Sequence, residues 1–147
     1  MKLPLALRVC NVIAVLLFTL FSWLQWNDVD PAIYDHPSVL DAALWGLFYL
    51  LIAILFAVSI FRPIPKWLLI AAAVFCLVEM GRTAPGLYKN LTGDDEFTMT
   101  QASMSAEDPR VELTREFFGA VIALVGVGAL AWENRFAGKK TSDAQQD

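Results

Sequence analysis

A run of apolar residues near the start of the chain constrains its fold more than any other feature. The run covers residues 9–26 and closes in the polar and acidic stretch of residues 25–31. An apolar helix needs ~17–25 residues, at ~1.5 Å rise each, to cross the hydrocarbon core of a bilayer. Trp23 and Trp26, followed at once by a carboxylate cluster, mark a membrane–water interface. We therefore predict an integral membrane protein.

The composition supports this class and argues against a nucleic-acid partner. Of the 147 residues, 57% are hydrophobic and 18% are charged, whereas charged residues make up about a quarter of a typical soluble domain. The net charge is -4, with no basic stripe to neutralise phosphates. Cys10 and Cys76 lie inside apolar runs, where we expect buried thiols rather than a disulfide. The first run is longer than a signal-peptide core and ends without a small-x-small cleavage pattern, so we interpret it as an uncleaved span.

Three more apolar runs predict three more spans, each with local start or stop signals. Ser38, followed three residues later by Asp41, is a helix start signal, and the two prolines in residues 62–66 predict a tight basic turn. Asp108 before Pro109 favours the start of the last helix. The predicted fold is all-α: a single domain, residues 1–138, forming an up-down four-helix transmembrane bundle with spans at about residues 6–26, 39–61, 66–86 and 112–134.

The distribution of lysine and arginine predicts that both termini lie in the cytoplasm. Basic residues precede the first span, join the second to the third and follow the fourth, whereas residues 27–38 contain none. The third connection does contain basic residues, which weakens the contrast there. We expect a multi-pass protein of the plasma membrane, or of the inner membrane in a bacterium, with a disordered cytoplasmic tail at residues 139–147.

Small residues indicate where the helices approach one another. Gly119, Ala123 and Gly126 recur at i, i+4 and i+7 on the last helix, and Ala42 and Gly46 recur at i, i+4 on the second. This spacing allows close backbone contact in membrane bundles. The alternative is that glycine and alanine are simply common in membrane helices.

Polar residues gather at the predicted outer side of the membrane, and we call this set the outer rim. Glu79 and Arg82 share a helix face at i, i+3 and can form an ion pair, whereas the carboxylates four residues apart on the last helix point the same way beside Arg115. Ionisable groups near hydrocarbon are costly unless they are paired or face a cavity. The predicted binding residues are Gln25, Asn27, Asp28, Asp30, Glu79, Arg82, Glu112, Arg115 and Glu116.

Two interpretations of the outer rim remain open. In the first, which we favour, it is a structural salt-bridge network in which Arg115, with Arg82 as a second contributor, offsets the carboxylates. In the second it holds a hard divalent cation, and the oxygen ligands would be Asp28, Asp30, Glu112 and Glu116. No other cofactor is indicated, since the lone His36 is expected to be solvated and no phosphate loop, HExxH or CxxC motif is present.

The third connection is long and contains scattered apolar residues, so we expect residues 89–106 to cover the outer end of the bundle. Long loops often serve as covers over functional sites. A disordered hairpin is the alternative. The apolar residues in and beside this connection are Leu87, Tyr88, Phe97, Met99 and Met104, and Asn90-Leu91-Thr92 fits the glycosylation pattern.

The end of the first span, Gln25-x-Asn27-Asp28-x-Asp30-Pro31, resembles the transmembrane protein 220 family of small four-span membrane proteins. The acidic and arginine-containing segment of residues 112–116 is similar to the segment that opens the final span of that family. Val29 stands where the family pattern has proline, and the loop of residues 91–108 is longer than usual. The resemblance implies a four-span architecture and implies no mechanism.

The sequence favours a non-enzymatic membrane protein, either an accessory subunit or a small binding protein whose outer rim meets a partner or a cation. One alternative is an intramembrane metal-dependent enzyme with Glu112 or Glu116 as general base. A second alternative is a small transporter, although no broken-helix repeat is evident. The expected partners are the lipid bilayer and either a partner protein or a second copy of the chain.

Overall fold

A computed structural model describes residues 3–30, 38–104 and 108–143, with side chains described as far as residue 135. Within this part the chain is helical and contains no strand, which confirms the predicted all-α class. Short 3₁₀ helices follow α1 and precede α4. The helices are α1 (Leu5–Leu24), η1 (Gln25–Val29), α2 (Val39–Ser59), α3 (Lys66–Thr92), η2 (Gln101–Ser103) and α4 (Arg110–Asp143).

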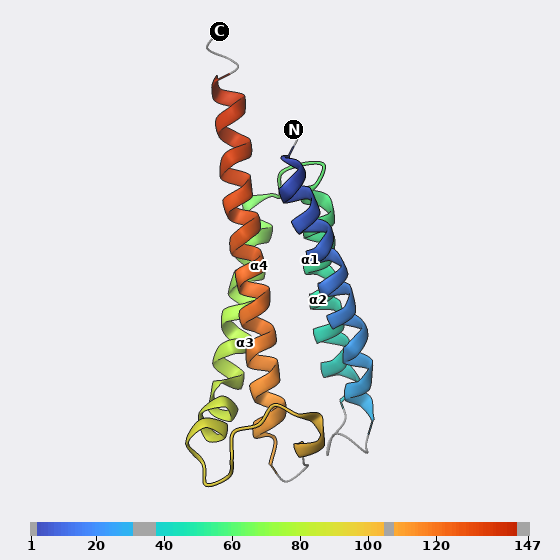
Figure 1. The fold of residues 1–147 in the computed structure, drawn as a ribbon, viewed down its shortest axis with the longest axis vertical. Coiled ribbons are helices and arrows are strands. Elements are labelled where there is room, and N and C mark those ends of the chain that lie inside the picture. The colour runs from blue at the N-terminus through green and yellow to red at the C-terminus, as the bar shows by residue number, and fades with distance from the viewer. Residues whose placement is uncertain (1–2, 31–37, 105–107, 144–147) are drawn as a thin grey trace.

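Two antiparallel hairpins form the bundle. Helix α1 packs along α2, α3 packs along α4, and the hairpins meet mainly where α2 faces α4. Figure 1 shows the start of α1 and the end of α4 at one end of the molecule, together with the connection between α2 and α3. We call this the terminal end and the opposite one the loop end. Among the residues described, four helices are long and apolar enough to cross a membrane, as predicted, whereas the cytoplasmic location of the termini stays a prediction.

The local start signals place the helices as the sequence predicts. The Ser38 hydroxyl accepts a hydrogen bond from the Asp41 backbone N–H at 3.2 Å and so caps α2. An Asp108 carboxylate oxygen accepts one from the Arg110 N–H at 3.4 Å at the start of α4. Helix α3 begins directly after Pro65, at the end of the predicted basic turn.

Helices α3 and α4 both extend further than the predicted spans. Helix α3 continues through Pro85 to Thr92, six residues beyond the predicted end of the span at residue 86. Proline removes one helical hydrogen bond, but packing overrides this loss, because Gly86, the next residue, lies directly against Leu113 of α4. Helix α4 continues to Asp143, whereas the sequence predicted a disordered tail from residue 139. Lys139 and Lys140 begin this stretch, and lysine has high helix propensity.

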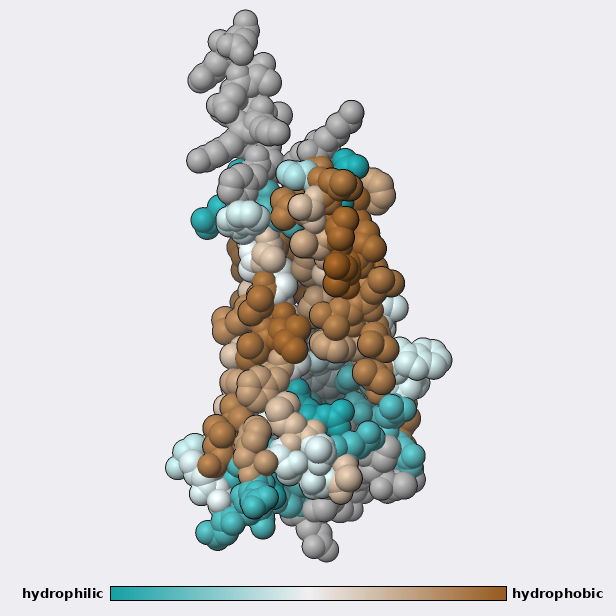
Figure 2. Space-filling view, viewed as in Figure 1, coloured by the Kyte–Doolittle hydropathy of each residue, from teal (hydrophilic) through white to brown (hydrophobic). Residues whose placement is uncertain are grey.

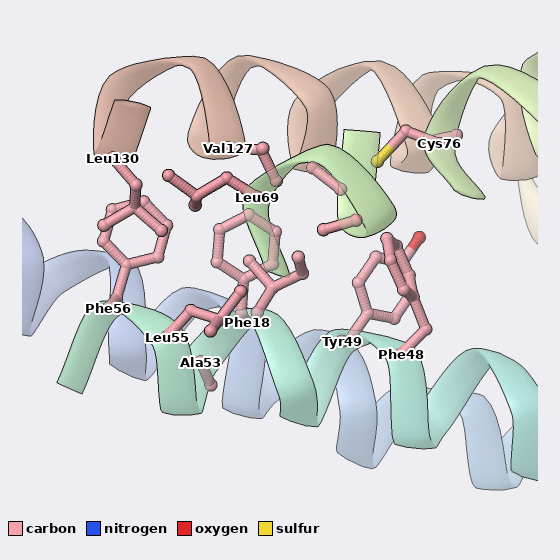
Figure 3. Packing of buried hydrophobic residues seen from close by; sticks show 14 of the residues in the cluster. Phe18, Phe48, Tyr49, Ala53, Leu55, Phe56, Leu69, Cys76, Val127 and Leu130 are labelled. Carbon is pink, nitrogen blue, oxygen red and sulfur yellow. The ribbon is translucent and has the colours of Figure 1, made fainter. Parts of the chain in front are cut away.

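Aromatic rings fill the space between the two hairpins. The rings of Phe18 and Phe56 stack with centroids 5.8 Å apart, and those of Phe48 and Phe75 lie 4.4 Å apart. Figure 3 shows these side chains of α1 and α2 directed toward Leu69, Val127 and Leu130 of the second hairpin. The core is therefore a contact between hairpins as well as within them.

Two glycines of α4 leave the space that the aromatic rings occupy. A Cβ on Gly119 would collide with the Tyr49 hydroxyl, and a Cβ on Gly126 would lie 3.2 Å from the Phe56 ring and 3.3 Å from the Phe18 ring. A Cβ on Gly46 would meet only ordinary van der Waals contact, and α1 and α2 are joined there by the 2.8 Å hydrogen bond that the Ser22 hydroxyl donates to the Gly46 carbonyl. The predicted role of small residues in close helix packing is thus present at Gly119 and Gly126.

The outer surface of the bundle is apolar over most of its height. Figure 2 shows brown, apolar side chains along the helices and teal, polar side chains concentrated toward the loop end. Large exposed residues such as Leu16, Leu47 and Ile70 lie on this surface. Such a surface is favourable in lipid, where exposed apolar groups carry no solvation cost.

Substitution of Gly119 with leucine tests the packing of α4 on α2. The new side chain would overlap Tyr49, and we expect a loss of roughly 1–3 kcal/mol in unfolding free energy, as is usual for overpacked sites. Gly128→Leu is the matched control, because nothing lies within 4 Å of the Cβ position there. Thermal unfolding in detergent measures both. Equal stability of the two variants would contradict the packing.

Candidate functional site

A cavity of about 240 Å³ lies at the loop end, between the two hairpins. Its walls come from α1, η1, α2, α4 and the loop that precedes α4. Figure 2 shows polar side chains in a hollow flanked by apolar ones at this height. The residues that line the cavity are Phe21, Leu24, Gln25, Asp28, Trp45, Tyr49, Met99, Glu112, Arg115, Glu116, Phe118, Gly119 and Ile122.

The periodicity of α4 places its polar groups on the cavity. Glu112, Arg115, Glu116 and Gly119 follow one another at i, i+3, i+4 and i+7, so they form one helix face. Gly119 sits beneath the two carboxylates and admits the Tyr49 hydroxyl from α2. The wall of the cavity is consequently acidic toward the loop end and aromatic below.

Arg82 of α3 anchors one of these carboxylates from behind. Its Nε donates a 2.7 Å hydrogen bond to Glu79, and its Nη2 donates a 3.0 Å hydrogen bond to Glu116. Nη2 also lies 4.0 Å from a carboxylate oxygen of Asp41 in α2. The side chains of Glu79 and Glu116 are 15% exposed, so Arg82 compensates two carboxylates that water reaches poorly. The predicted i, i+3 pair of Glu79 and Arg82 is confirmed.

The structure brings together part of the outer rim. Five of its residues line the cavity, namely Gln25, Asp28, Glu112, Arg115 and Glu116. Glu79 and Arg82 stand behind them, whereas Asn27 and Asp30 are exposed and do not line it.

The arginine at the centre of the network differs from the one that the sequence favoured. Within the described residues no carboxylate lies within ion-pair distance of Arg115, and its Nη1 donates to the Met104 sulfur at 3.0 Å. Arg82, which was predicted as the second contributor, makes the contact instead, because α3 packs along α4 and brings position 82 opposite position 116.

The described acidic residues are spread around the cavity and beside it rather than gathered into one cluster. In the described ranges no three His, Cys, Asp or Glu side chains form a group that could hold one. Asp28, Glu112 and Glu116 border the cavity from η1 and α4, and Asp30 lies outside it. His36 falls in residues 31–37, outside the described part of the chain.

Comparison with known proteins identifies the family. The sequence matches the family described as "Transmembrane family 220, helix" over residues 17–132. The chain belongs to transmembrane family 220. No curated protein and no solved structure shows a significant match. The matched residues contain the cavity and Arg82, so the family membership and the four apolar helices together show a small multi-pass membrane protein.

In this member of family 220, hydrogen bonds attach the loop before α4 to the bundle. The Asn90 side chain donates to the Thr98 carbonyl at 2.7 Å and to the Thr114 hydroxyl at 3.0 Å, and it accepts from the Thr98 N–H at 3.3 Å. Met99 consequently reaches the cavity, whereas Phe97 stays 49% exposed. The amide predicted as a glycosylation acceptor is therefore buried and bonded internally.

Ion pairs hold the end of the same loop at Asp108, and we call the group of Lys89, Asp95, Asp108 and Arg110 the Asp108 clamp. The Asp108 carboxylate accepts from Lys89 Nζ at 2.9 Å and pairs with Arg110 Nε at 2.8 Å. Arg110 also pairs with Asp95 at 3.4 Å. The hydrogen bond from Lys89, together with the nearby Arg110, holds the pKa of Asp108 below its ordinary value.

Sequence reasoning missed a second polar group, at the terminal end. The buried Asn11 amide of α1 donates to the Ser59 hydroxyl of α2 at 2.8 Å and to the Glu133 carboxylate of α4 at 3.0 Å. Asn11 interrupts an otherwise apolar run, and polar residues inside membrane helices usually have a partner. That interruption is the signal that could have identified it. Asn11 and Glu133 both lie outside the residues matched to the family.

The Asp108 clamp predicts a pH-dependent contribution to stability. A carboxylate whose pKa is lowered on folding stabilises the protein above its unfolded pKa, and this contribution is lost as pH falls through the folded pKa. We expect Asp108→Asn to be less stable than the native protein near neutral pH, with the difference shrinking under acid. Asp94→Asn, at an exposed loop position, is the control. Thermal unfolding as a function of pH measures all three, and a difference that grows on acidification would contradict the clamp.

Proposed function

We propose that this protein is a non-enzymatic membrane binding protein, and that its loop-end cavity holds a ligand with an ammonium group. The observation that carries the proposal is the position of Glu112. Its carboxylate lines the cavity, and within the described residues it has no hydrogen-bond or ion-pair partner. An ionisable group at such a depth favours a cavity ligand of opposite charge.

The balance of charge around the cavity supports a cationic ligand. Arg82 is shared among Glu79, Glu116 and Asp41. Glu112 adds further negative charge on the cavity wall, and Arg115 is the positive residue among its lining groups. Carboxylates therefore outnumber guanidinium groups, and a bound cation would reduce their repulsion.

The aromatic walls favour an organic cation over a bare metal ion. Trp45 and Tyr49 line the cavity with their rings stacked at a centroid distance of 5.5 Å, and Phe21 lies beside them. Alkylammonium groups bind over aromatic faces, with roughly 0.5–2 kcal/mol gained per contact. A metal ion needs several oxygen ligands close together, and the described acidic residues do not supply such a group.

The mouth of the cavity suits a ligand with an apolar tail. Leu24 of α1 and Phe118 and Ile122 of α4 line it, and they are 42%, 37% and 41% exposed on the lipid-facing surface. The volume of about 240 Å³ is below the ~300–1,000 Å³ of pockets that enclose a whole drug-sized ligand. We infer that the cavity holds the head group while the tail lies along the bundle.

The other candidate functions fit this geometry less well. The metal-dependent enzyme is less well supported, because the described residues offer no group of ligands for a metal ion and Glu116, one of its two candidate bases, is ion-paired with Arg82. Transporters bind substrates near the bilayer midplane, whereas this cavity lies at the end of the helices where η1 begins. An accessory subunit would use the same acidic cavity to hold a basic group of its partner.

Thermal stability in a neutral detergent tests the proposal. A short-chain alkyltrimethylammonium salt should raise the melting temperature of the purified protein with a saturating dose response. The alcohol of the same chain length should not, because it lacks the charge. Calcium and manganese chloride, added separately, test the metal alternative.

Two variants connect the result to the cavity. Glu112→Gln should abolish the ammonium-dependent rise, and Glu96→Gln, which removes an exposed loop carboxylate, should leave it intact. An equal response to the alcohol, or an undiminished response in Glu112→Gln, would refute the proposal. Saturable stabilisation by the metal salts alone would support the cation site instead.

A further inference from the structure

A second groove lies at the terminal end, between the start of α3 and α4. It has a volume of about 480 Å³ and is separate from the loop-end cavity in every lining residue. Its wall combines positive and apolar side chains from the two helices. They are Lys66, Leu69, Ile70, Ala131, Asn134 and Arg135.

The charge of this groove is positive and uncompensated by the described residues. Lys66 and Arg135 are exposed and line it from opposite helices. In the described ranges neither forms an ion pair, although the lysines and arginines of the loop end pair repeatedly. Two cations held beside one groove, without a carboxylate between them, favour an anionic ligand.

Hydrogen bonds between the two sides of the groove hold its walls in place. The Asn134 side chain accepts a hydrogen bond from the Ile64 N–H at 3.1 Å and donates one to the Ile64 carbonyl at 2.7 Å. This pair of hydrogen bonds attaches the turn before α3 to α4. It fixes Lys66, at the first position of α3, next to Arg135.

The position of the groove matches the head-group region of a bilayer. Trp67, next to Lys66, is 67% exposed, as is typical of tryptophans at membrane interfaces. Ile70 is 64% exposed and continues the groove along the lipid-facing surface. The first N–H groups of α3 point toward the same end and add partial positive charge. Phosphate therefore fits at the rim, and acyl chains fit below it.

We propose that this groove binds the phosphate head group of an anionic glycerophospholipid. Lys66 and Arg135 contact the phosphate, and Leu69, Ile70 and Ala131 contact the upper acyl chain. Basic pockets between membrane helices on the cytoplasmic side bind such lipids, and the sequence predicts that the terminal end is cytoplasmic. This inference is independent of the ligand in the loop-end cavity.

The full-length protein in a neutral detergent provides the test. Added phosphatidylglycerol should raise the melting temperature saturably, whereas phosphatidylcholine should not. The double variant Lys66→Gln/Arg135→Gln should need on the order of tenfold more phosphatidylglycerol to reach half the rise in melting temperature. The reason is that each cation near the membrane surface adds to the attraction for anionic lipid. Native mass spectrometry should show fewer retained phosphatidylglycerol molecules on the same variant.

Matched variants separate the groove from general surface charge and from misfolding. Arg62→Gln removes an exposed cation of the same end that does not line the groove, and it should behave like the native protein. Lys66→Arg/Arg135→Lys keeps both charges and should also retain the response. Should the neutral double variant fail to fold, the single variants Lys66→Gln and Arg135→Gln, each with a partial loss, serve in its place.

Three outcomes would overturn the proposal. The first is an equal loss of the lipid response in Arg62→Gln, which would show general surface attraction. The second is full stabilisation by inorganic phosphate without lipid, which would show an anion site unrelated to the bilayer. The third is an unchanged lipid response in the neutral double variant.

Discussion

In a bilayer, apolar side chains gain little by leaving lipid to pack on another helix, and this constraint governs how the two hairpins join. Association must come from close packing and from polar contacts. The structure supplies both. Gly119 and Gly126 admit aromatic rings of the other hairpin, and polar ties lie toward each end. Asn11 binds Glu133 at the terminal end, and Arg82 approaches Asp41 at the loop end.

The same constraint explains why the polar ties differ in character. At the terminal end, Asn11 and Glu133 are 1% and 6% exposed, and their hydrogen bonds bring together three helices. At the loop end, Arg82 is 44% exposed and draws Glu116 toward α3. The hairpins leave space on the other side of Glu116, where Glu112 and the stacked rings of Trp45 and Tyr49 form the walls. The buried contact of Asn11 with Glu133 can stabilise the bundle, whereas the contact of Arg82 with Glu116 lies beside a cavity that can also bind a ligand.

Local signals in the sequence predicted the elements, and the pairing of helices decided the site. The caps at Ser38 and Asp108 and the pair of Glu79 and Arg82 involve residues at most three apart, so they were predictable from spacing. The contact of Arg82 with Glu116 spans 34 residues, and that of Asn11 with Glu133 spans 122. These contacts depend on which helices become neighbours, which spacing along one helix does not reveal. For the same reason α3 passes Pro85, because packing on α4 outweighs a local signal.

A double-mutant cycle on Asn11 and Glu133 tests most directly whether polar ties hold the hairpins together. Unfolding free energies would be measured in detergent for the native protein, Asn11→Ala, Glu133→Ala and the double variant. The structure predicts a favourable coupling of roughly 0.6–1.7 kcal/mol, the range found for hydrogen bonds between membrane helices. Strictly additive effects of the two substitutions would show that the hydrogen bond contributes nothing, and would contradict this account of hairpin docking.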